Sequence, residues 1–289
     1  PEDHAFVTDA AHREEGGTPA IIESVRAGLV FQLKEAVGWE TIRAREHDFI
    51  TRAIASWSRH PDLLILGNKD AWRLSIVSFV VRHQDAYLHH NFVVALLNDL
   101  FGIQARGGCS CAGPYGHRLL GIDLATSKEF EREIVRGCEG IKPGWVRVNF
   151  NYFLSETQFQ FLLDAIHLIA TDGWKFLPDY TFCPETGLWR HRRGRPDATM
   201  RLADVTYRTG RMEFRSRHAT EPESALAGYL DDARRLVAAV GAGAAAGECT
   251  DAERTADFEA LRWFPLPTEV AAELAGAPAP SRPRPSFKR

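Results

Sequence analysis

The stretch that decides the fold is Arg106-Gly107-Gly108-Cys109-Ser110-Cys111-Ala112-Gly113-Pro114-Tyr115-Gly116-His117-Arg118. An apolar segment with helical spacing, residues 91–101, leads to Gly102, and residues 103–105 then form a short strand-like piece. Glycine permits backbone conformations that other residues avoid, so side chains in such a turn can be aimed at a ligand. The alternative is a plain loop with two small buried thiols.

The chain before this stretch alternates helices and strands. Thr18 and Pro19 predict a helix start, since Thr is a good N-cap and Pro suits the first helical position. The helix carries apolar residues at helical spacing and ends at Gly38. We expect a second helix over 40–58, strands over 63–66 and 74–81, and the helix over 91–101.

After the stretch the pattern predicts a polar helix over 128–138 and a strand over 145–150. Ser155 and Gln158 form a capping-box pattern that starts another helix. The order of elements predicts an α/β protein, more closely an α+β domain.

From residue 173 to residue 245 we expect an additional segment of two hairpins, near 180–189 and 207–214, and a helix over 223–240. Between the hairpins, residues 190–195 form a basic run. Such a run could hold phosphate or RNA, but it is more often a solvated face, and nucleic acid is not expected as a partner. Residues 246–289 are expected to be a low-complexity, disordered tail.

Composition limits which cellular compartment and which partners we expect. The net charge of -3 gives no general reason to expect nucleic acid or a membrane surface as partner. The five cysteines are odd in number and mostly scattered, which indicates a reducing compartment, so we expect a cytoplasmic protein without disulfides. No apolar run reaches the roughly 18 residues that span a bilayer.

Four segments in the right order resemble the class V aminotransferase-fold enzymes, which depend on pyridoxal 5'-phosphate (PLP) and include cysteine desulfurases and selenocysteine lyases. The resemblance covers roughly residues 10–172. The segments are Arg13-Glu14-Glu15-Gly16-Gly17-Thr18-Pro19, the strand at 74–81, the helix 88–103 with the loop Arg106–Pro114, and the strand Val146-Arg147-Val148-Asn149-Phe150.

The resemblance implies roles for individual residues. Gly17 and Thr18 would contact the PLP phosphate, usually across the interface of a homodimer. A dianion suits a helix N-terminus. Arg147 would bind the α-carboxylate of an amino-acid substrate, and Arg106 would be a second anion-facing residue. The planar fork of arginine matches a carboxylate with two parallel hydrogen bonds. By alternation alone, Arg147 lies opposite the apolar face and could be a plain surface residue.

Cys111 falls at the position of the family's catalytic cysteine, which accepts sulfur and becomes a persulfide. Such a cysteine needs exposure and positive charge nearby, which Arg106 and Arg118 could supply. The sequence departs from the family here, because Cys109-Ser110 stands where the related desulfurases usually carry His-His. Cys109 and Cys111 could instead form a redox pair or be inert. No metal site is expected.

A further departure concerns the lysine that holds PLP as a Schiff base. In the family it precedes the Arg-x-Glu-x-Gly-Thr-Pro segment, and no lysine precedes residue 13 here. We therefore expect the C-terminal portion of a longer enzyme that is inactive by itself. Residues 1–38 would end the PLP-binding large domain, and residues 39–172 would form the small domain.

The expected activity is PLP-dependent transformation of an amino acid, as a transferase or lyase, with cysteine desulfuration at Cys111 as one form. The alternative is a non-enzymatic interaction module that retains the fold.

Overall fold

The structure, a computed structural model, describes residues 5–109, 113–194, 201–214, 221–240 and 255–277. A five-stranded antiparallel sheet lies at its centre, in the order β1-β2-β5-β4 with β3 paired to β2. The strands are β1 (Leu63–Ile65), β2 (Ile76–His83), β3 (Ala86–Tyr87), β4 (Arg106–Gly108) and β5 (Trp145–Asn149). The fold therefore mixes helices with an antiparallel sheet, which agrees with the α+β expectation.

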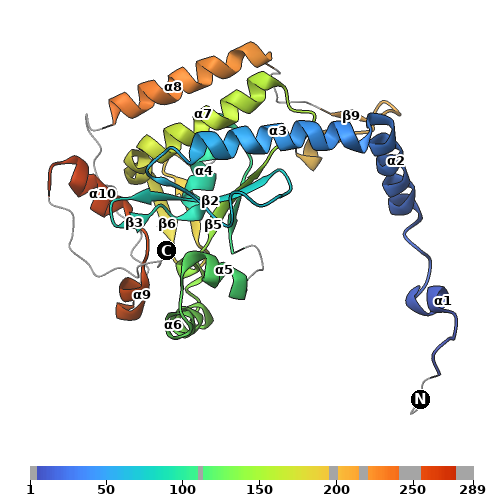
Figure 1. Cartoon of the computed structure of the whole chain (residues 1–289), viewed down its shortest axis with the longest axis horizontal. Helices are drawn as coiled ribbons and strands as arrows, with labels where there is room; N and C mark the ends of the chain where they lie inside the picture. Colours follow the sequence, from blue (N-terminus) through green and yellow to red (C-terminus); the bar gives the residue numbers. More distant parts are fainter. Residues whose placement is uncertain (1–4, 110–112, 195–200, 215–220, 241–254, 278–289) are drawn as a thin grey trace.

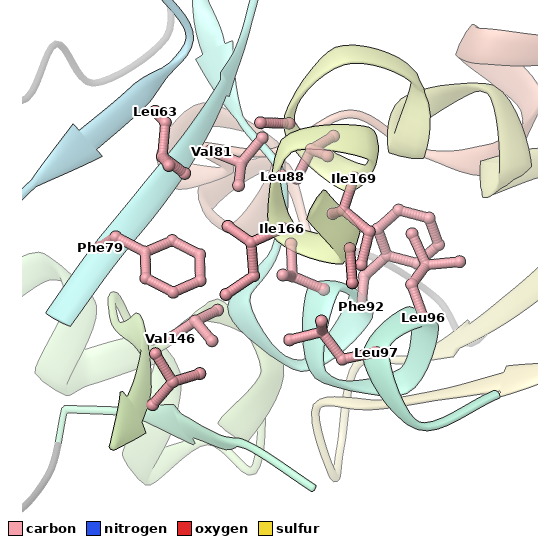
Figure 2. Close-up of a cluster of buried hydrophobic side chains, with 14 of the residues drawn as sticks. Leu63, Phe79, Val81, Leu88, Phe92, Leu96, Leu97, Val146, Ile166 and Ile169 are labelled. Carbon is pink, nitrogen blue, oxygen red and sulfur yellow. The ribbon is translucent and has the colours of Figure 1, made fainter. Parts of the chain in front are cut away.

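Helices cover the two faces of this sheet unequally (Figure 1). One face packs against α3 (Trp39–Trp57), α4 (His90–Phe101) and α7 (Glu156–Asp172), and α8 (Leu226–Ala239) lies outside α7. The other face carries α5 (Gly113–Leu120) near one end. Helix α6 (Leu124–Val135) follows α5, and its Phe130 belongs to the main core. The main core fills the first interface, where Phe79, Val81 and Val146 from the strands meet Phe92 and Ile166 from α4 and α7 (Figure 2).

Several helix ends follow the sequence signals. Ser155 accepts from the Gln158 N–H, and the Gln158 side chain returns to the Ser155 N–H, which confirms the capping box of α7. Gly102 ends α4 in the left-handed conformation, with φ of 65°, where a side chain would be strained. Gly38, with φ of 84°, separates α2 (Ile21–Val37) from α3.

Other boundaries differ from the predictions. Helix α2 begins at Ile21 with Ala20 as N-cap and no side-chain cap, so the prediction of an N-cap at Thr18 is wrong. The strand expected at 103–105 lies at 106–108, where the backbone pairs with β5. Helix α6 begins after Asp123, whose side chain accepts from the Thr126 N–H, and it ends at Val135 rather than at residue 138.

The apolar face of α2 is exposed in this chain. Its large apolar side chains between residues 21 and 33 are 56–67% exposed, and none of its residues is buried. Together with α1 (Ala10–Glu14), α2 projects away from the body (Figure 1). Nothing in the described residues covers this face.

The segment after residue 172 joins the same core. Strands β6 (Tyr180–Cys183) and β7 (Leu188–His191) form the predicted first hairpin, and β8 (Val205–Thr206) pairs with β9 (Glu213–Phe214) in the second. Phe182 and Trp189 of the first hairpin are buried in the main core, as are Leu230 and Ala233 of α8.

The prediction of a disordered tail over 246–289 is wrong for residues 255–277. They form α9 (Ala256–Leu261) and α10 (Pro267–Leu274). The link between these helices, residues 262–266, is buried throughout. The Ala/Gly-rich residues 241–247 and the Pro-rich end suggested disorder, but a short apolar cluster between them buries Phe258, Trp263 and Phe264.

Candidate functional site

The two arginines singled out in the sequence lie directly opposite each other in the sheet. Arg106 of β4 pairs in register with Arg147 of β5, and Arg147 in turn lies opposite Ser78 of β2. Residues directly opposite in an antiparallel pair place their side chains on the same face, with Cβ atoms about 4.5–5.5 Å apart. The register therefore places the two arginine side chains next to each other on one face of the sheet.

These arginines occupy the face of the sheet that the main core does not use. Val146 and Val148 on either side of Arg147 are buried in the main core, so strand alternation directs Arg147 to the other face. One end of that face is covered, because Leu66, Val80, Leu120 and Trp145 form a small second core against α5. Toward the other end Ile76 is 37% exposed, Arg147 is half-buried and Arg106 is exposed, so a ligand can reach the pair.

Electrostatics favour an anion at this place. Among the described residues no acidic side chain forms an ion pair with Arg106 or Arg147. Like charges directly opposite each other on a sheet are destabilising. A carboxylate bound between them would remove the repulsion and could accept paired hydrogen bonds from either planar fork. The chemistry of the pair is therefore that of a carboxylate or phosphate receptor.

Two buried histidines support the strands from the core side, and sequence reasoning gave them no role. His89 is 1% exposed and contacts the Gly140 carbonyl at 3.1 Å through Nε2, while its Nδ1 accepts from the Asn91 N–H at 3.1 Å. His90 is 6% exposed and lies beside Gly107 of β4. Burial lowers the pKa of His89 well below its ordinary value and that of His90 to about 4, so both rings are neutral near pH 7. Their position at the start of α4, with His89 as the N-cap and His90 as the first helical residue, was the available signal.

Gly17 and Thr18 are not brought to this place. They lie exposed in the link between α1 and α2, which extends away from the sheet (Figure 1). Their contact with a PLP phosphate therefore stays a prediction, because the structure does not place them beside the arginine pair.

Cys111 lies outside the described residues. The neighbouring Cys109 is a half-buried free thiol directly after β4. Arg118, expected to supply positive charge to the loop, is exposed on α5. Cys138 and Cys183 are also free thiols, and burial raises the pKa of Cys138.

A cavity lies away from the arginine pair, between α4, residues 104–105 and strand β7. It has a volume of about 590 Å³, and Asp99, Gln104, Trp189, Arg190 and His191 are among its lining residues. The first residues of the basic run thus border a cavity rather than a plain solvated face. Gln104 and Ala105 lead directly into Arg106, but neither arginine of the pair lines this cavity.

The described lysines do not complete a cofactor site beside the arginines. Lys142 and Lys175 pair with Glu139 and Asp172, each three residues away on the same turn. Lys34, Lys69 and Lys128 are exposed on α2, the β1–β2 loop and α6, and strands β2, β4 and β5 contain no lysine. The residues present fit the carboxylate of a substrate and do not by themselves fit covalently held PLP.

The described residues contain neither a cluster of metal ligands nor a membrane-spanning helix. No group of three or more His, Cys, Asp or Glu side chains within them is arranged to hold a metal ion. None of the helices in this part of the chain combines the length and the apolar character needed to cross a membrane.

Comparison with known proteins agrees with the resemblance seen in the motifs. Residues 2–136 match the sequence model of the aminotransferase class-V family. A protein described as "Probable cysteine desulfurase" from Streptomyces coelicolor is 31% identical over 122 residues, which is 42% of this chain. The aligned part spans only 28% of that protein. Over residues 2–136 this chain is therefore class V aminotransferase-like.

Proposed function

We propose that this chain binds the α-carboxylate of an amino-acid substrate at the Arg106–Arg147 pair, as part of a PLP-dependent, class V aminotransferase-like enzyme. The observation that carries the proposal is the in-register placement, on an open face of the sheet, of two arginines that have no acidic partner among the described residues. Residues 39–172 would then act as the small, substrate-binding domain, and residues 1–38 would belong with the PLP-binding domain.

The two arginines have different parts in this proposal. Arg147 is half-buried on a strand with a neighbour on both sides, so its backbone is fixed by β2 and β4. A partly buried guanidinium is screened less by water and is the better anchor for a carboxylate. Arg106 lies exposed on the edge strand and would close over the ligand or discriminate among side chains.

The cofactor and its lysine are proposed to come from outside the described residues. PLP, when bound, supplies the electron sink for chemistry at the substrate's Cα. This chain's contribution would be orientation, since a fixed carboxylate sets which Cα bond faces the cofactor. Gly17 and Thr18 would reach the PLP phosphate in a homodimer. The exposed apolar face of α2 supports the need for a further surface against it.

Cysteine desulfuration is the reaction we propose within this class, with Cys111 as sulfur acceptor. The similarity to a protein described as a probable cysteine desulfurase supports it. After incubation of the PLP-loaded, full-length enzyme with L-cysteine, the peptide that contains Cys111 should gain the mass of one sulfur atom, and Cys111→Ala should abolish the gain. An equal rate of sulfide release by Cys111→Ala and the native protein would remove Cys111 from the mechanism.

A non-enzymatic interaction module is the alternative, and the open apolar face of α2 is the observation that favours it. The two can be separated by the visible absorbance of bound PLP in the native polypeptide that contains this chain. Bound PLP supports the enzyme. No PLP absorbance, together with a stable complex formed through α2, supports the module.

The carboxylate role is tested by Arg147→Gln in the PLP-loaded enzyme. Hydrogen bonds to charged groups are worth about 1.5–3 kcal/mol, so KM for the amino acid should rise about 10- to 100-fold. The change in kcat should be smaller, because the interaction is made in both ground and transition states. Arg190→Gln, on β7, is the matched control and should leave KM unchanged. An unchanged KM for Arg147→Gln would reject the role.

A further inference from the structure

We infer that His90 is a positioning residue that holds β4 against β5, and that Trp263 of the C-terminal segment holds His90 in turn. The inference deepens the proposed function and rests on it for its consequence, since it assigns residues 255–277 to the architecture of the carboxylate site. These residues lie beyond the part of the chain that matches the family.

The first argument is steric. The His90 ring lies between Gly107 of β4 and Gly144, which directly precedes β5. A Cβ added to Gly107 would lie 3.0 Å from His90 Nδ1, and one added to Gly144 would lie 2.5 Å from Cδ2 and 2.7 Å from Nε2. The Gly107 Cβ would also lie 2.7 Å from Asn91 Oδ1, and the Gly144 Cβ 2.8 Å from the backbone carbonyl carbon of Gly108, so the ring and these neighbours together exclude a side chain at either glycine. His90 thus fills the space that both strands leave for it.

The hydrogen bonds around His90 reach the segment before β5 and the next residue of α4. His90 Nε2 lies 3.3 Å from the Lys142 carbonyl, and Nδ1 lies 3.0 Å from Asn91 Oδ1. Both neighbours are acceptors, so the neutral ring donates to one of them at a time. Asn91 Nδ2 donates to the Gly187 carbonyl at 2.8 Å, which ties this corner to the β6–β7 turn.

The C-terminal segment covers the histidine pair through one residue. The Trp263 ring stacks on His89 at 5.2 Å and on His90 at 5.9 Å between centroids. Its indole N–H donates to the Ile141 carbonyl at 3.0 Å, and its own carbonyl accepts from the Tyr87 N–H at 3.2 Å. Trp263 is therefore fixed to the segment before β5 and to β3 while it contacts the His90 ring.

The position of Arg106 depends on the His90 ring and its contact with Trp263, because strand β4 makes few hydrogen bonds that would fix its place in the sheet. Strand β4 has three residues and pairs on one side only. So short an edge strand has few ladder hydrogen bonds, and packing against α4 decides its position. Arg106 directly precedes Gly107, and Arg147 lies three residues after Gly144. A shift of the His90 ring would therefore alter the distance between the two guanidinium groups.

The test compares His90→Ala, His90→Gln and Trp263→Leu with Phe49→Leu. Phe49 is a buried ring between α3 and α7, stacked on Phe159, so Phe49→Leu is a core truncation away from β4. Amide hydrogen exchange of Arg106–Gly108 is measured at matched global stability, together with propionate affinity from the arginine side-chain NMR signals. His90→Ala and Trp263→Leu should speed exchange at β4 about tenfold and weaken propionate about fivefold. His90→Gln should have intermediate effects on the exchange rate and on propionate affinity, and Phe49→Leu should change neither quantity.

The inference would be overturned if amide exchange at β4 and propionate affinity were both unchanged in a folded His90→Ala or Trp263→Leu variant. If His90→Ala does not fold, His90→Gln and Trp263→Leu decide in the same way. Failure of the proposed function is distinguishable. If Arg147→Gln binds propionate as the native chain does, the carboxylate role fails, while the exchange result at β4 still decides whether His90 positions the strand.

Discussion

Glu269→Gln should destabilise the protein by about 3–5 kcal/mol, the cost of breaking a buried ion pair by removing one partner. Arg262, in the link between α9 and α10, is 2% exposed. Its guanidinium donates to both Glu269 carboxylate oxygens, at 2.8 and 2.7 Å, and through Nε to Glu259 at 3.0 Å. The same arginine donates to the Phe264 carbonyl at 2.6 Å. The neutral amide would leave much of this buried charge uncompensated.

The size of the loss in the free energy of unfolding distinguishes a C-terminal segment that packs on the core from one that does not. A change of 3–5 kcal/mol corresponds to a fall in Tm of roughly 6–20 °C for a domain of this size. A surface ion pair is worth only about 0–1 kcal/mol. Arg52 with Glu156 supplies that comparison in this chain, because the two carboxylate–guanidinium contacts, at 3.1 and 2.7 Å, join side chains that are 40% and 65% exposed.

The assay is urea unfolding followed by circular dichroism on the native chain, Glu269→Gln, Arg262→Met, the double variant and the matched control Glu156→Gln. The double variant should lose less than the sum of the singles, by about 1–3 kcal/mol, because the partners interact directly. A loss below about 1 kcal/mol for Glu269→Gln, equal to that of Glu156→Gln, would refute the docking of residues 255–277.

Three further outcomes follow from single features of the fold. Burial lowers the pKa of His90 from 6.5 to about 4, so its contribution to stability is complete above about pH 6.5 and is lost as pH falls toward 4. Urea titrations at several pH values should show a loss of about 3 kcal/mol that His90→Gln reduces; a slope that the variant leaves unchanged would contradict this. Gly102→Ala should cost about 1 kcal/mol in the same assay because φ is 65° there, and a stabilised variant would be inconsistent with the left-handed cap. Burial raises the pKa of the Cys138 thiol, so iodoacetamide at pH 7.5 should alkylate Cys138 more slowly than denatured chain; equal rates by peptide mass spectrometry would exclude that effect.

Local signals in the sequence predicted most of the central elements. The capping box at Ser155, the glycine at 102 and the alternation around Arg147 each reflect short-range physics, which acts within a few residues. The shift of β4 from 103–105 to 106–108 has the opposite origin. Its bounds depend on pairing with β5, about forty residues later, and no local pattern contains that information.

The site was predictable only in part for the same reason. Motif order identified Arg106 and Arg147, but their direct opposition arises from strand register. His90 and Trp263 were missed because their contact joins residues 173 positions apart, and a low-complexity segment separates Trp263 from the rest. The prediction of an N-cap at Thr18 was wrong because the helix begins at Ile21, so Ala20 and not Thr18 occupies the N-cap position.

Binding of propionate to the arginine pair tests the central claim most directly. Propionate carries the carboxylate of an amino acid without its amine, and the Nε–H signals of Arg106 and Arg147 report binding without any cofactor. The account predicts saturable shifts of both signals in the native chain, and a dissociation constant at least tenfold higher in Arg147→Gln, which is about 1.4 kcal/mol. Shifts that are absent, or that persist unchanged in Arg147→Gln, would contradict a carboxylate site on this face of the sheet.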